Sequence, residues 1–370
     1  MKLHGRCNFQ RNSGRSLGTD QGWLSRIQNG KVTRYQDSAA RDYPMTAVLE
    51  DREGRIWTGT NGGGFARFDA GKFTHFARSP EISKDRITSI VEGDGDELWV
   101  GTEGGLQHLS GGTWKTYTKR DGLLSDCVLS LYYDAEGALW IGTAAGGLNR
   151  FKDGRLKSFG IEQGLYNSTV GAIVEDTRGY LWMTSNKGIF RVSKHELNEV
   201  AAGRKAKVYS TAYGIADGLR SPECNFGTVA SATRSVDGRL WFPTIAGVAA
   251  IDPARILTNR LSPTVGVEGV WVDGAPVGPP IGGAIAVDRG HGALTIHFTA
   301  PTFVAPERVH FRYTLEGFDH TWTDAGERRV AYYTNLPPGS YNLPGTSNEQ
   351  RRYLEHGRSK HRIALAPPIL

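Results

Sequence analysis

A tryptophan recurs along this chain at a nearly constant interval, and no other feature limits the possible folds so strongly. The first four repeated tryptophans are spaced by 42, 41 and 42 residues, and a fifth follows 59 residues later: Trp57, Trp99, Trp140, Trp182 and Trp241. Six residues after each stands a glycine: Gly63, Gly105, Gly146, Gly188 and Gly247. Such a period indicates repeated units that bury their hydrophobic faces only against one another.

Each repeat contains four short runs with strand character. Around Trp140 these are residues 139–143, 147–151, 155–159 and 170–176, and Gly-Gly and Asp-Gly pairs separate the first three. Four strands in a period of about 40–45 residues are typical of one β-propeller blade. We expect the tryptophan to fill the space between neighbouring sheets, and the glycine to take a positive φ in the hairpin.

The number of repeats predicts an incomplete propeller. Five whole copies and a partial one at 18–35 give about six blade units of four antiparallel strands, over residues 18–256. We expect that further blades precede these, and that residues 1–17 lie outside the pattern. A six-bladed closed ring with an irregular last unit is the alternative.

The composition and the pattern of the sequence change after residue 256. Residues 257–283 are rich in proline and glycine and predict a linker and a first edge strand. Residues 284–341, with alternating runs at 293–300 and 310–317, predict an immunoglobulin-like β-sandwich that is incomplete. The chain is therefore expected to be all-β, a propeller followed by a sandwich.

The charge of the chain is concentrated at its two ends. The net charge is +6, but residues 1–17 contribute +4 and residues 342–370 contribute +3, which leaves −1 for the body. A nucleic-acid partner is therefore not expected. The three cysteines have no CxxC spacing, and no catalytic motif such as HExxH, GxSxG or a Walker loop occurs. We expect no catalytic residue, no metal and no cofactor.

No stretch of the sequence predicts an export signal or a membrane span, because apolar runs of the required length are missing. The chain as it stands is therefore expected not to insert into a membrane, and to be cytoplasmic if made in this form.

The amino-acid sequence of the repeats resembles that of a known family. "LWIGTAAGGLNRF" followed by Asp-Gly resembles two-component regulator propeller repeats, and residues 294–341 resemble the Y_Y_Y domain that follows such propellers. Fourteen residues carry the second resemblance: Phe311, Tyr313, Leu315, Gly317, Asp319, Trp322, Tyr332, Tyr333, Asn335, Leu336, Pro337, Pro338, Gly339 and Tyr341.

The resemblance implies the periplasmic sensor region of a bacterial hybrid histidine kinase, with a non-catalytic propeller that senses a ligand, in several cases an oligosaccharide. It also implies a homodimer through the sandwich, whose arrangement shifts to signal. The chain has no kinase segment and no membrane span, so we expect a fragment of such a sensor.

The tail after Tyr341 departs from the family pattern. The tail covers residues 342–370. It begins "NLPGTSNEQRRYLEHGRSKHR", residues 342–362, where the family continues with a strand, and we expect a frameshift there. The last strand of the sandwich would then be missing, leaving unpaired strand edges.

Three polar residues are the predicted ligand contacts: Asn167, Glu223 and Asn225. They lie in segments leading into the inner strands, which should converge on one mouth of the central channel. Amide and carboxylate groups form the hydrogen bonds that sugar hydroxyls accept and donate, although capping of local turns is an equal alternative. A protein-interaction scaffold, and a propeller lyase or quinone-dependent enzyme, are the rival functions.

Overall fold

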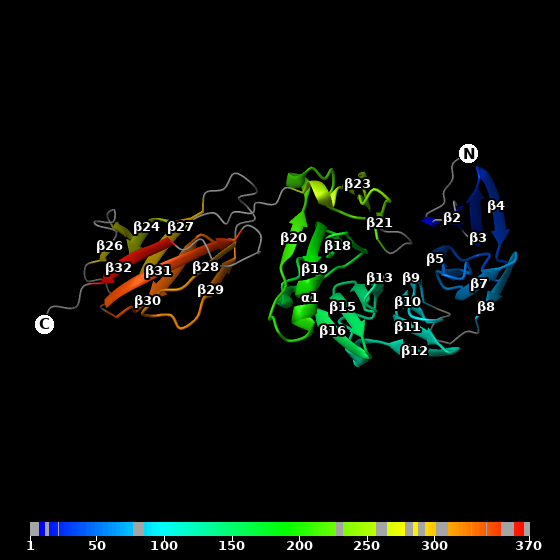
Figure 1. The fold of residues 1–370 in the computed structure, drawn as a ribbon, viewed down its shortest axis with the longest axis horizontal. Coiled ribbons are helices and arrows are strands. Elements are labelled where there is room, and N and C mark those ends of the chain that lie inside the picture. The colour runs from blue at the N-terminus through cyan, green and yellow to red at the C-terminus, as the bar shows by residue number, and fades with distance from the viewer. Residues whose placement is uncertain are drawn as a thin grey trace. The chain divides into compact units, whose positions relative to one another are not determined.

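The computed structural model of the 370-residue chain is all-β and divides into two compact units, Met1–Arg255 and Ile256–Leu370. It describes residues 7–11, 15–20, 22–76, 85–226, 232–256, 265–277, 284–287, 293–300, 310–326, 328–337, 339–348 and 359–365. The first unit is a β-propeller whose sheets follow one another around an arc (Figure 1).

The described residues of the first unit form six antiparallel sheets, numbered here in chain order. The first three are sheet 1 with β1 (Cys7–Arg11), β2 (Arg15–Asp20), β3 (Trp23–Gln28) and β4 (Lys31–Gln36), sheet 2 with β5 (Met45–Glu50), β6 (Ile56–Thr60), β7 (Phe65–Asp69) and β8 (Lys72–His75), and sheet 3 with β9 (Ile87–Glu92), β10 (Leu98–Thr102), β11 (Gly105–Ser110) and β12 (Thr113–Tyr117).

The remaining sheets are sheet 4 with β13 (Val128–Tyr133), β14 (Leu139–Thr143), β15 (Gly147–Lys152) and β16 (Arg155–Phe159), sheet 5 with β17 (Ile173–Glu175), β18 (Tyr180–Ser185), β19 (Gly188–Ser193) and β20 (Ser210–Tyr213), and sheet 6 with β21 (Thr233–Arg234), β22 (Leu240–Thr244) and β23 (Gly247–Ile251). Helix α1 (Lys194–Ala201) is inserted between β19 and β20.

The repeated tryptophans lie in matching seams, as predicted. Trp57 packs with residues of sheet 3, Trp99 with residues of sheet 4, and Trp140 with residues of sheet 5. All three are at most 4% exposed. A fully buried aromatic side chain contributes several kcal/mol, so these seams account for much of the stability of the unit.

A second glycine, not recognised in the sequence, fits the sheets together. Gly59, Gly101 and Gly142 each lie on the second strand of a sheet, where the first strand of the next sheet approaches. A Cβ at Gly142 would stand 2.5 Å from the carbonyl oxygen of Val170, and one at Gly101 would stand 2.7 Å from Val128. Only glycine allows the next inner strand to come this close.

The hairpin glycine differs from the prediction in two sheets. Gly105, Gly188 and Gly247 have positive φ, as expected for the residue six positions after tryptophan. In sheets 2 and 4 the hairpin is one residue longer, so Gly64 and Gly147 take the positive φ instead. Gly63 and Gly146 instead leave room for the segment that enters their own sheet. Tyr43 packs against Gly63, and Leu124 and Ser125 pack against Gly146.

An aspartate six residues before the tryptophan clamps the turn between the first two strands. In sheets 2, 4 and 5 its Oδ2 accepts a hydrogen bond from the indole Nε1 at 2.8 Å: Asp51–Trp57, Asp134–Trp140 and Asp176–Trp182. Its Oδ1 accepts from the backbone N–H groups two and four residues later. We call this arrangement the Asp–Trp clamp; it satisfies buried donors that would otherwise be costly.

Among the five sheets with a repeated tryptophan, two depart from the clamp. In sheet 6 the hydroxyl of Ser235 replaces the carboxylate and accepts from Trp241 at 2.9 Å. In sheet 3 the position is Gly93, and within the described residues Trp99 Nε1 has no hydrogen-bond partner. Trp99 instead stacks on His108, with ring centroids 3.7 Å apart.

Part of the N-terminal segment, which lies outside the sequence pattern of the repeat, forms a strand of sheet 1. Cys7–Arg11 forms β1, which pairs with β2 and completes sheet 1. The segment carries neither the tryptophan nor the glycines of the repeat, and backbone pairing alone makes it a strand.

The second unit is a two-sheet sandwich. One sheet has the order β25 (Ala275–Val277), β24 (Gly266–Val272), β27 (Ala293–Thr299), β30 (Val330–Thr334), and the other β26 (Ala284–Val287), β32 (Ser359–Leu365), β31 (Gly339–Asn348), β28 (His310–Tyr313), β29 (Thr323–Gly326). Their inner faces enclose a core that includes Val270, Ile296, Phe298, Phe311 and Tyr333.

The expected loss of the last sandwich strand is not observed. β31 runs on to Asn348 and pairs with β28, and β32 pairs with β31 and with β26, so the tail fills the middle of the second sheet. Pairing along the backbone does not depend on the family's side-chain pattern, which is why the off-pattern sequence still forms strands. The frameshift concerns the gene and stays a prediction.

Candidate functional site

The topology of the first unit gives it two different ends. In a four-stranded antiparallel sheet, the segment from the fourth strand to the next sheet and the hairpin between the second and third strands lie at the same end. We call this end the loop face and the opposite one the turn end. The Asp–Trp clamps lie at the turn end, because they close the hairpin between the first and second strands.

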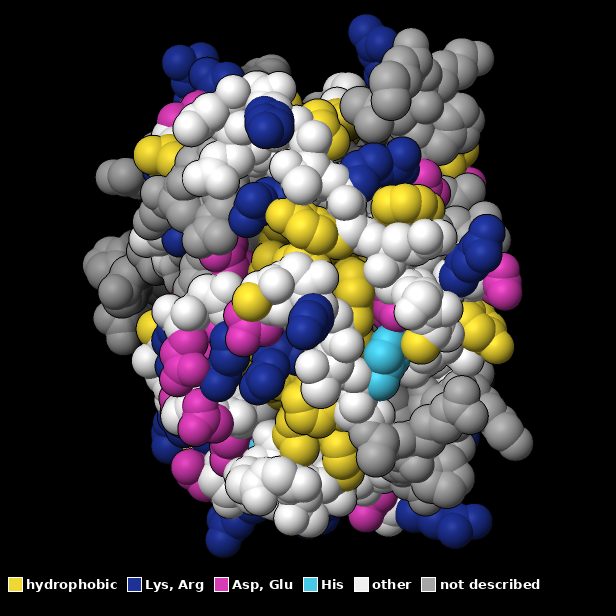
Figure 2. Space-filling model, turned by 90° about the vertical axis from the view of Figure 1, so that its right-hand side faces the viewer, with side chains coloured by type: hydrophobic (Ala, Val, Ile, Leu, Met, Phe, Trp, Pro, Cys, Tyr) yellow, Lys and Arg dark blue, Asp and Glu magenta, His cyan; other side chains and the backbone are white. Residues whose placement is uncertain are grey.

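Exposed hydrophobic side chains gather on the loop face. Nine large hydrophobic residues are exposed among the described residues of the first unit, and six are in loop-face segments: Tyr43, Leu124, Ile161, Tyr166, Ile215 and Ile245. The outer side of the unit, at β4 and β8, also shows hydrophobic side chains in a broken band among Lys and Arg (Figure 2). The loop face is therefore taken as the candidate functional site.

The loop-face segments entering sheets 4 and 5 have the same construction. Each begins with a short 3-10 helix, η1 (Lys119–Asp121) or η2 (Ile161–Gln163), closed by a glycine with positive φ, Gly122 or Gly164. The next leucine, Leu123 or Leu165, is 3% exposed and lies in the seam between sheets. The residue after it therefore points outward, and this places Leu124 and Tyr166 on the surface at equivalent positions.

Tyr166 is held firmly although 40% of it is exposed. Its backbone N–H donates to the Ser210 hydroxyl at 3.0 Å, and that hydroxyl donates to the carbonyl of Gly164. The phenol donates to the carbonyl of Lys187, and the ring lies 5.6 Å from the ring of Phe190. A fixed, partly exposed aromatic ring binds a ligand with little loss of side-chain entropy.

The predicted ligand residue Asn167 is buried, and both ends of its amide have partners inside the protein. Its Oδ1 accepts from the backbone N–H of Thr169 at 2.8 Å, and its Nδ2 donates to Asn186 at 3.3 Å. In this structure it joins the loop entering sheet 5 to the hairpin of that sheet.

Glu223 and Asn225 are exposed at the start of sheet 6. The carbonyl of Glu223 accepts from the N–H of Ile245, and Asn225 Nδ2 donates to the carbonyl of Thr244 at 3.2 Å. The backbone of Cys224 between them reaches Ser185 of sheet 5. The structure thus places all three predicted residues on the loop face, on the segments entering sheets 5 and 6. Contact with a ligand stays a prediction.

The loop face carries little net charge. Residues 118–127 contain two basic and two acidic side chains, residues 160–172 one acidic, and residues 214–226 one basic and two acidic. Such a surface suits a neutral ligand better than a phosphate or a nucleic acid.

Neither cysteine of the loop face is a reactive nucleophile. Burial raises the pKa of the Cys224 thiol to about 11, and burial together with the charge of Glu103 raises the pKa of Cys127. Both side chains are therefore thiols at neutral pH, and thiols are poor nucleophiles. Within the described residues, no three His, Cys, Asp or Glu side chains are placed to hold a metal ion.

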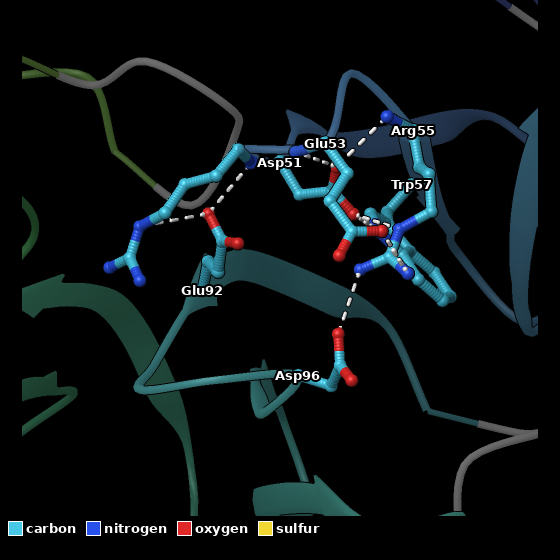
Figure 3. A network of polar contacts seen from close by, with 7 residues as sticks. Asp51, Glu53, Arg55, Trp57, Glu92 and Asp96 are labelled. Atoms are coloured by element: carbon cyan, nitrogen blue, oxygen red, sulfur yellow. Dashed lines mark hydrogen bonds and ion pairs between the residues drawn. The ribbon is translucent and has the colours of Figure 1, made fainter.

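The turn end has the opposite character, since charged side chains connect neighbouring sheets there. Arg52 of sheet 2 contacts Glu92 of sheet 3 through its backbone N–H and its guanidinium. Figure 3 shows the neighbouring connection, in which Arg55 reaches Asp96 at 3.5 Å. Burial raises the pKa of Asp51, but hydrogen bonds from Trp57 and Arg55 outweigh it and hold that pKa below the usual 3.8.

Sheets 4 and 5 have their own charged connection. Lys194, at the start of α1, contacts Glu175 at 2.7 Å, Glu136 at 3.0 Å and Asp134 at 3.8 Å. Burial lowers the pKa of Lys194, yet these carboxylates outweigh it and raise the pKa above its usual value. All these contacts are internal, so the turn end stabilises the scaffold while the loop face offers a surface.

Models of two known families match parts of the two units. The two-component regulator propeller family matches residues 41–62 and 122–145, and the Y_Y_Y domain family matches residues 302–343. The chain carries two-component regulator propeller repeats and a Y_Y_Y domain. The first match covers the turn, second strand and loop-face segments of sheets 2 and 4, which confirms the resemblance seen in the sequence. No curated protein matches the sequence.

Solved structures with the same fold include extracellular domains of putative hybrid two-component systems. The extracellular domain of the putative hybrid two-component system BT3049 from B. thetaiotaomicron is 17% identical with a TM-score of 0.50, and the alignment covers 98% of this chain and 55% of that one. The extracellular domain of the putative hybrid two-component system BT4673 from B. thetaiotaomicron is 16% identical with a TM-score of 0.52, and the alignment covers 98% of this chain and 57% of that one. The chain thus spans a little over half the length of these domains.

A lyase is among the other similar structures. Virginiamycin B lyase from Staphylococcus aureus is 14% identical with a TM-score of 0.53, covering 79% of this chain and 90% of the lyase. At this identity the likeness shows the propeller fold alone. None of the helices among the described residues has the length and apolar character needed to span a bilayer.

Proposed function

We propose that this chain is the ligand-sensing, non-catalytic part of an extracytoplasmic two-component sensor, and that its loop face binds a neutral oligosaccharide. The succession of two-component regulator propeller repeats and a Y_Y_Y domain carries this proposal. The fold shared with extracellular domains of putative hybrid two-component systems supports it.

The character of the loop face supports a saccharide as the ligand. Sugar rings present apolar C–H faces that pack on aromatic rings, and hydroxyl groups that hydrogen-bond to amides and carboxylates. Tyr166 offers a partly exposed ring, and Glu223 and Asn225 offer exposed polar groups on the adjacent segment. The near absence of net charge argues against an anionic ligand.

The sandwich is proposed to join two chains and to pass on the signal. Ligand binding at the propeller would shift the population between two arrangements of such a dimer. Light scattering over a range of protein concentrations tests the dimer. A chain that remains monomeric at every concentration would remove this part of the proposal.

A thermal-shift screen with neutral oligosaccharides tests the ligand. At a hundredfold excess over the dissociation constant, a binding saccharide should raise the melting temperature of the propeller by about 5 °C or more. Tyr166→Ala should reduce the shift, whereas Val32→Ala, exposed on β4 away from the loop face, should not. A screen over glucan, xylan, mannan, galactan and arabinan fragments that gives no shift would refute the saccharide.

A protein-interaction scaffold is the second candidate, and the exposed apolar residues of the loop face favour it equally. A propeller lyase is the third, on the likeness in fold alone. Saccharide binding without turnover, followed by analysis of the recovered sugar, separates the sensor from both.

A further inference from the structure

The outer face of one sandwich sheet carries two aromatic side chains in a single row. β24, β27 and β30 are neighbours in this sheet, where Trp271 pairs with Thr295 and Thr295 pairs with Tyr332. The next residues along the strands, such as Ile296 and Ala331, are buried in the core of the sandwich. Because side chains alternate between the two faces of a strand, the three residues of the row point away from that core.

The indole of Trp271 is held down along the surface of the sheet. A Cβ at Gly269 would stand 2.8 Å from Cη2 and 2.9 Å from Cζ3 of Trp271, so the indole lies over this glycine. Only a residue without a side chain lets the ring lean back along its own strand in this way. His297, which pairs with Gly269, flanks the indole with ring centroids 4.2 Å apart. A ring fixed between two neighbours loses little side-chain entropy when a ligand packs on it.

Tyr332 provides a second ring at the other end of the row. It is 60% exposed, and the guanidinium carbon of Arg328 lies 6.0 Å from its ring centroid. β27 separates β24 from β30, so the backbones of Trp271 and Tyr332 are two strand spacings apart, about 9.5 Å. The face therefore presents an aromatic ring, the hydroxyl-bearing Thr295 and a second aromatic ring in succession.

The composition of this face favours a neutral saccharide over an anion or a protein. None of the paired outward positions around the row is Asp, Glu, Lys or Arg: Pro276, Trp271, Thr295, Tyr332, Gly269, His297 and Val330. A stable protein interface buries about 800 Å² on each partner around a continuous apolar centre, whereas a threonine separates the two rings here. Sugar rings have apolar C–H faces that pack on aromatic rings, and hydroxyl groups between them that need polar partners.

We propose that the outer face of β24, β27 and β30 is a saccharide-binding site, on which two sugar rings of one linear neutral oligosaccharide stack on Trp271 and Tyr332. The hydroxyl of Thr295 and the guanidinium of Arg328 are the groups that hydrogen-bond the sugar hydroxyls. This site belongs to the second unit, so it does not depend on saccharide binding at the loop face of the first.

Fluorine NMR of the full chain labelled with 5-fluorotryptophan tests this site directly. The label gives one signal for each of the nine tryptophans, and Trp271→Phe identifies the signal of Trp271. Linear hexasaccharides from glucan, xylan, mannan, galactan and arabinan are titrated to millimolar concentration. Trp322, which is 38% exposed and precedes β29 of the other sheet, is the matched control signal.

At least one hexasaccharide should move the Trp271 signal and leave the Trp322 signal in place. Tyr332→Ala should weaken this binding about tenfold, as expected for the loss of one stacked ring. Gly269→Ala should weaken it as well without removing a ring, because its Cβ displaces the indole. Tyr166→Ala should leave the Trp271 titration unchanged, which separates this site from the loop face.

Three results would overturn the proposal. The first is a Trp271 signal that no hexasaccharide moves. The second is a Trp271 titration with the same affinity in Tyr332→Ala, a variant at an exposed position whose fold is checked by thermal unfolding. The third is a Trp271 signal that moves with protein concentration alone, which would mean that a second copy of the chain covers this face. Failure of saccharide binding at the loop face would leave the Trp271 titration intact.

Discussion

Asp134→Ala should destabilise the propeller by several kcal/mol, because it removes one complete Asp–Trp clamp. Asp134 is 3% exposed and Trp140 is fully buried. The substitution leaves two buried donors without an acceptor, the indole Nε1 and the backbone N–H of Ala138. At about 1–3 kcal/mol for each unsatisfied buried donor, the loss is about 2–6 kcal/mol. Lys194 also loses one of its three carboxylates, at 3.8 Å.

Urea unfolding followed by tryptophan fluorescence measures this loss as a change in midpoint at constant slope. Asp126→Ala is the matched control, because that carboxylate accepts one exposed backbone N–H, from Lys119, and should cost about 1 kcal/mol or less. Asp134→Asn should fall between the two, since its amide still accepts from the backbone but presents a donor to the indole. If Asp134→Ala costs no more than Asp126→Ala, the Asp–Trp clamp is not a stabilising element.

Three further outcomes follow from the contacts described. The pKa of Asp51 is held below its usual 3.8, so its contribution to stability should be complete above pH 3.8 and be lost as the pH falls through the lowered pKa. In Asp51→Asn the free energy of unfolding should therefore fall less steeply with decreasing pH in this acid range. An unchanged slope in this range would contradict the assignment. Gly142→Ala should cost about 1–3 kcal/mol in the same unfolding assay, because its Cβ meets Val170, and a neutral result would disprove close packing of the inner strands. Tyr341→Phe should cost the sandwich about 1 kcal/mol in thermal unfolding by losing the 2.6 Å hydrogen bond to the Pro337 carbonyl, whereas no loss would make that bond incidental.

The sequence predicted the architecture well because the same pattern of residues recurs in several copies of the repeat. The spacing of the tryptophans, together with the four strand-like runs in each repeat, was sufficient to predict four-stranded units and the burial of Trp57, Trp99 and Trp140 between them. A strand without such markers escaped prediction, as Cys7–Arg11 did, because its pairing depends on the neighbouring backbone rather than on its own side chains.

Some contacts left a signal in the sequence that can be recognised once the structure is known. Aspartate stands six residues before tryptophan in three repeats, and Gly59, Gly101 and Gly142 stand two residues after it. Either regularity could have been noticed, but its meaning depends on the distance between strands of different sheets, which the sequence does not give.

The loop face was the hardest part to predict. In "GLYNS" the sequence contains an apolar and an aromatic residue side by side, and only the fold decides that Leu165 enters the seam and Tyr166 faces outward. The prediction favoured polar residues, and Asn167 is buried, with both the oxygen and the nitrogen of its side-chain amide hydrogen-bonded inside the protein. Local competition of this kind between capping and ligand contact is typical of asparagine in loops.

The separation of clamps and loops onto opposite ends has a consequence for how such proteins diverge. Substitutions in the segments around Leu124 and Tyr166 leave the bonds of Asp51, Asp134 and Asp176 untouched. The outward-facing positions Leu124 and Tyr166 can therefore diverge without loss of the clamps that hold the first turn of each of these sheets.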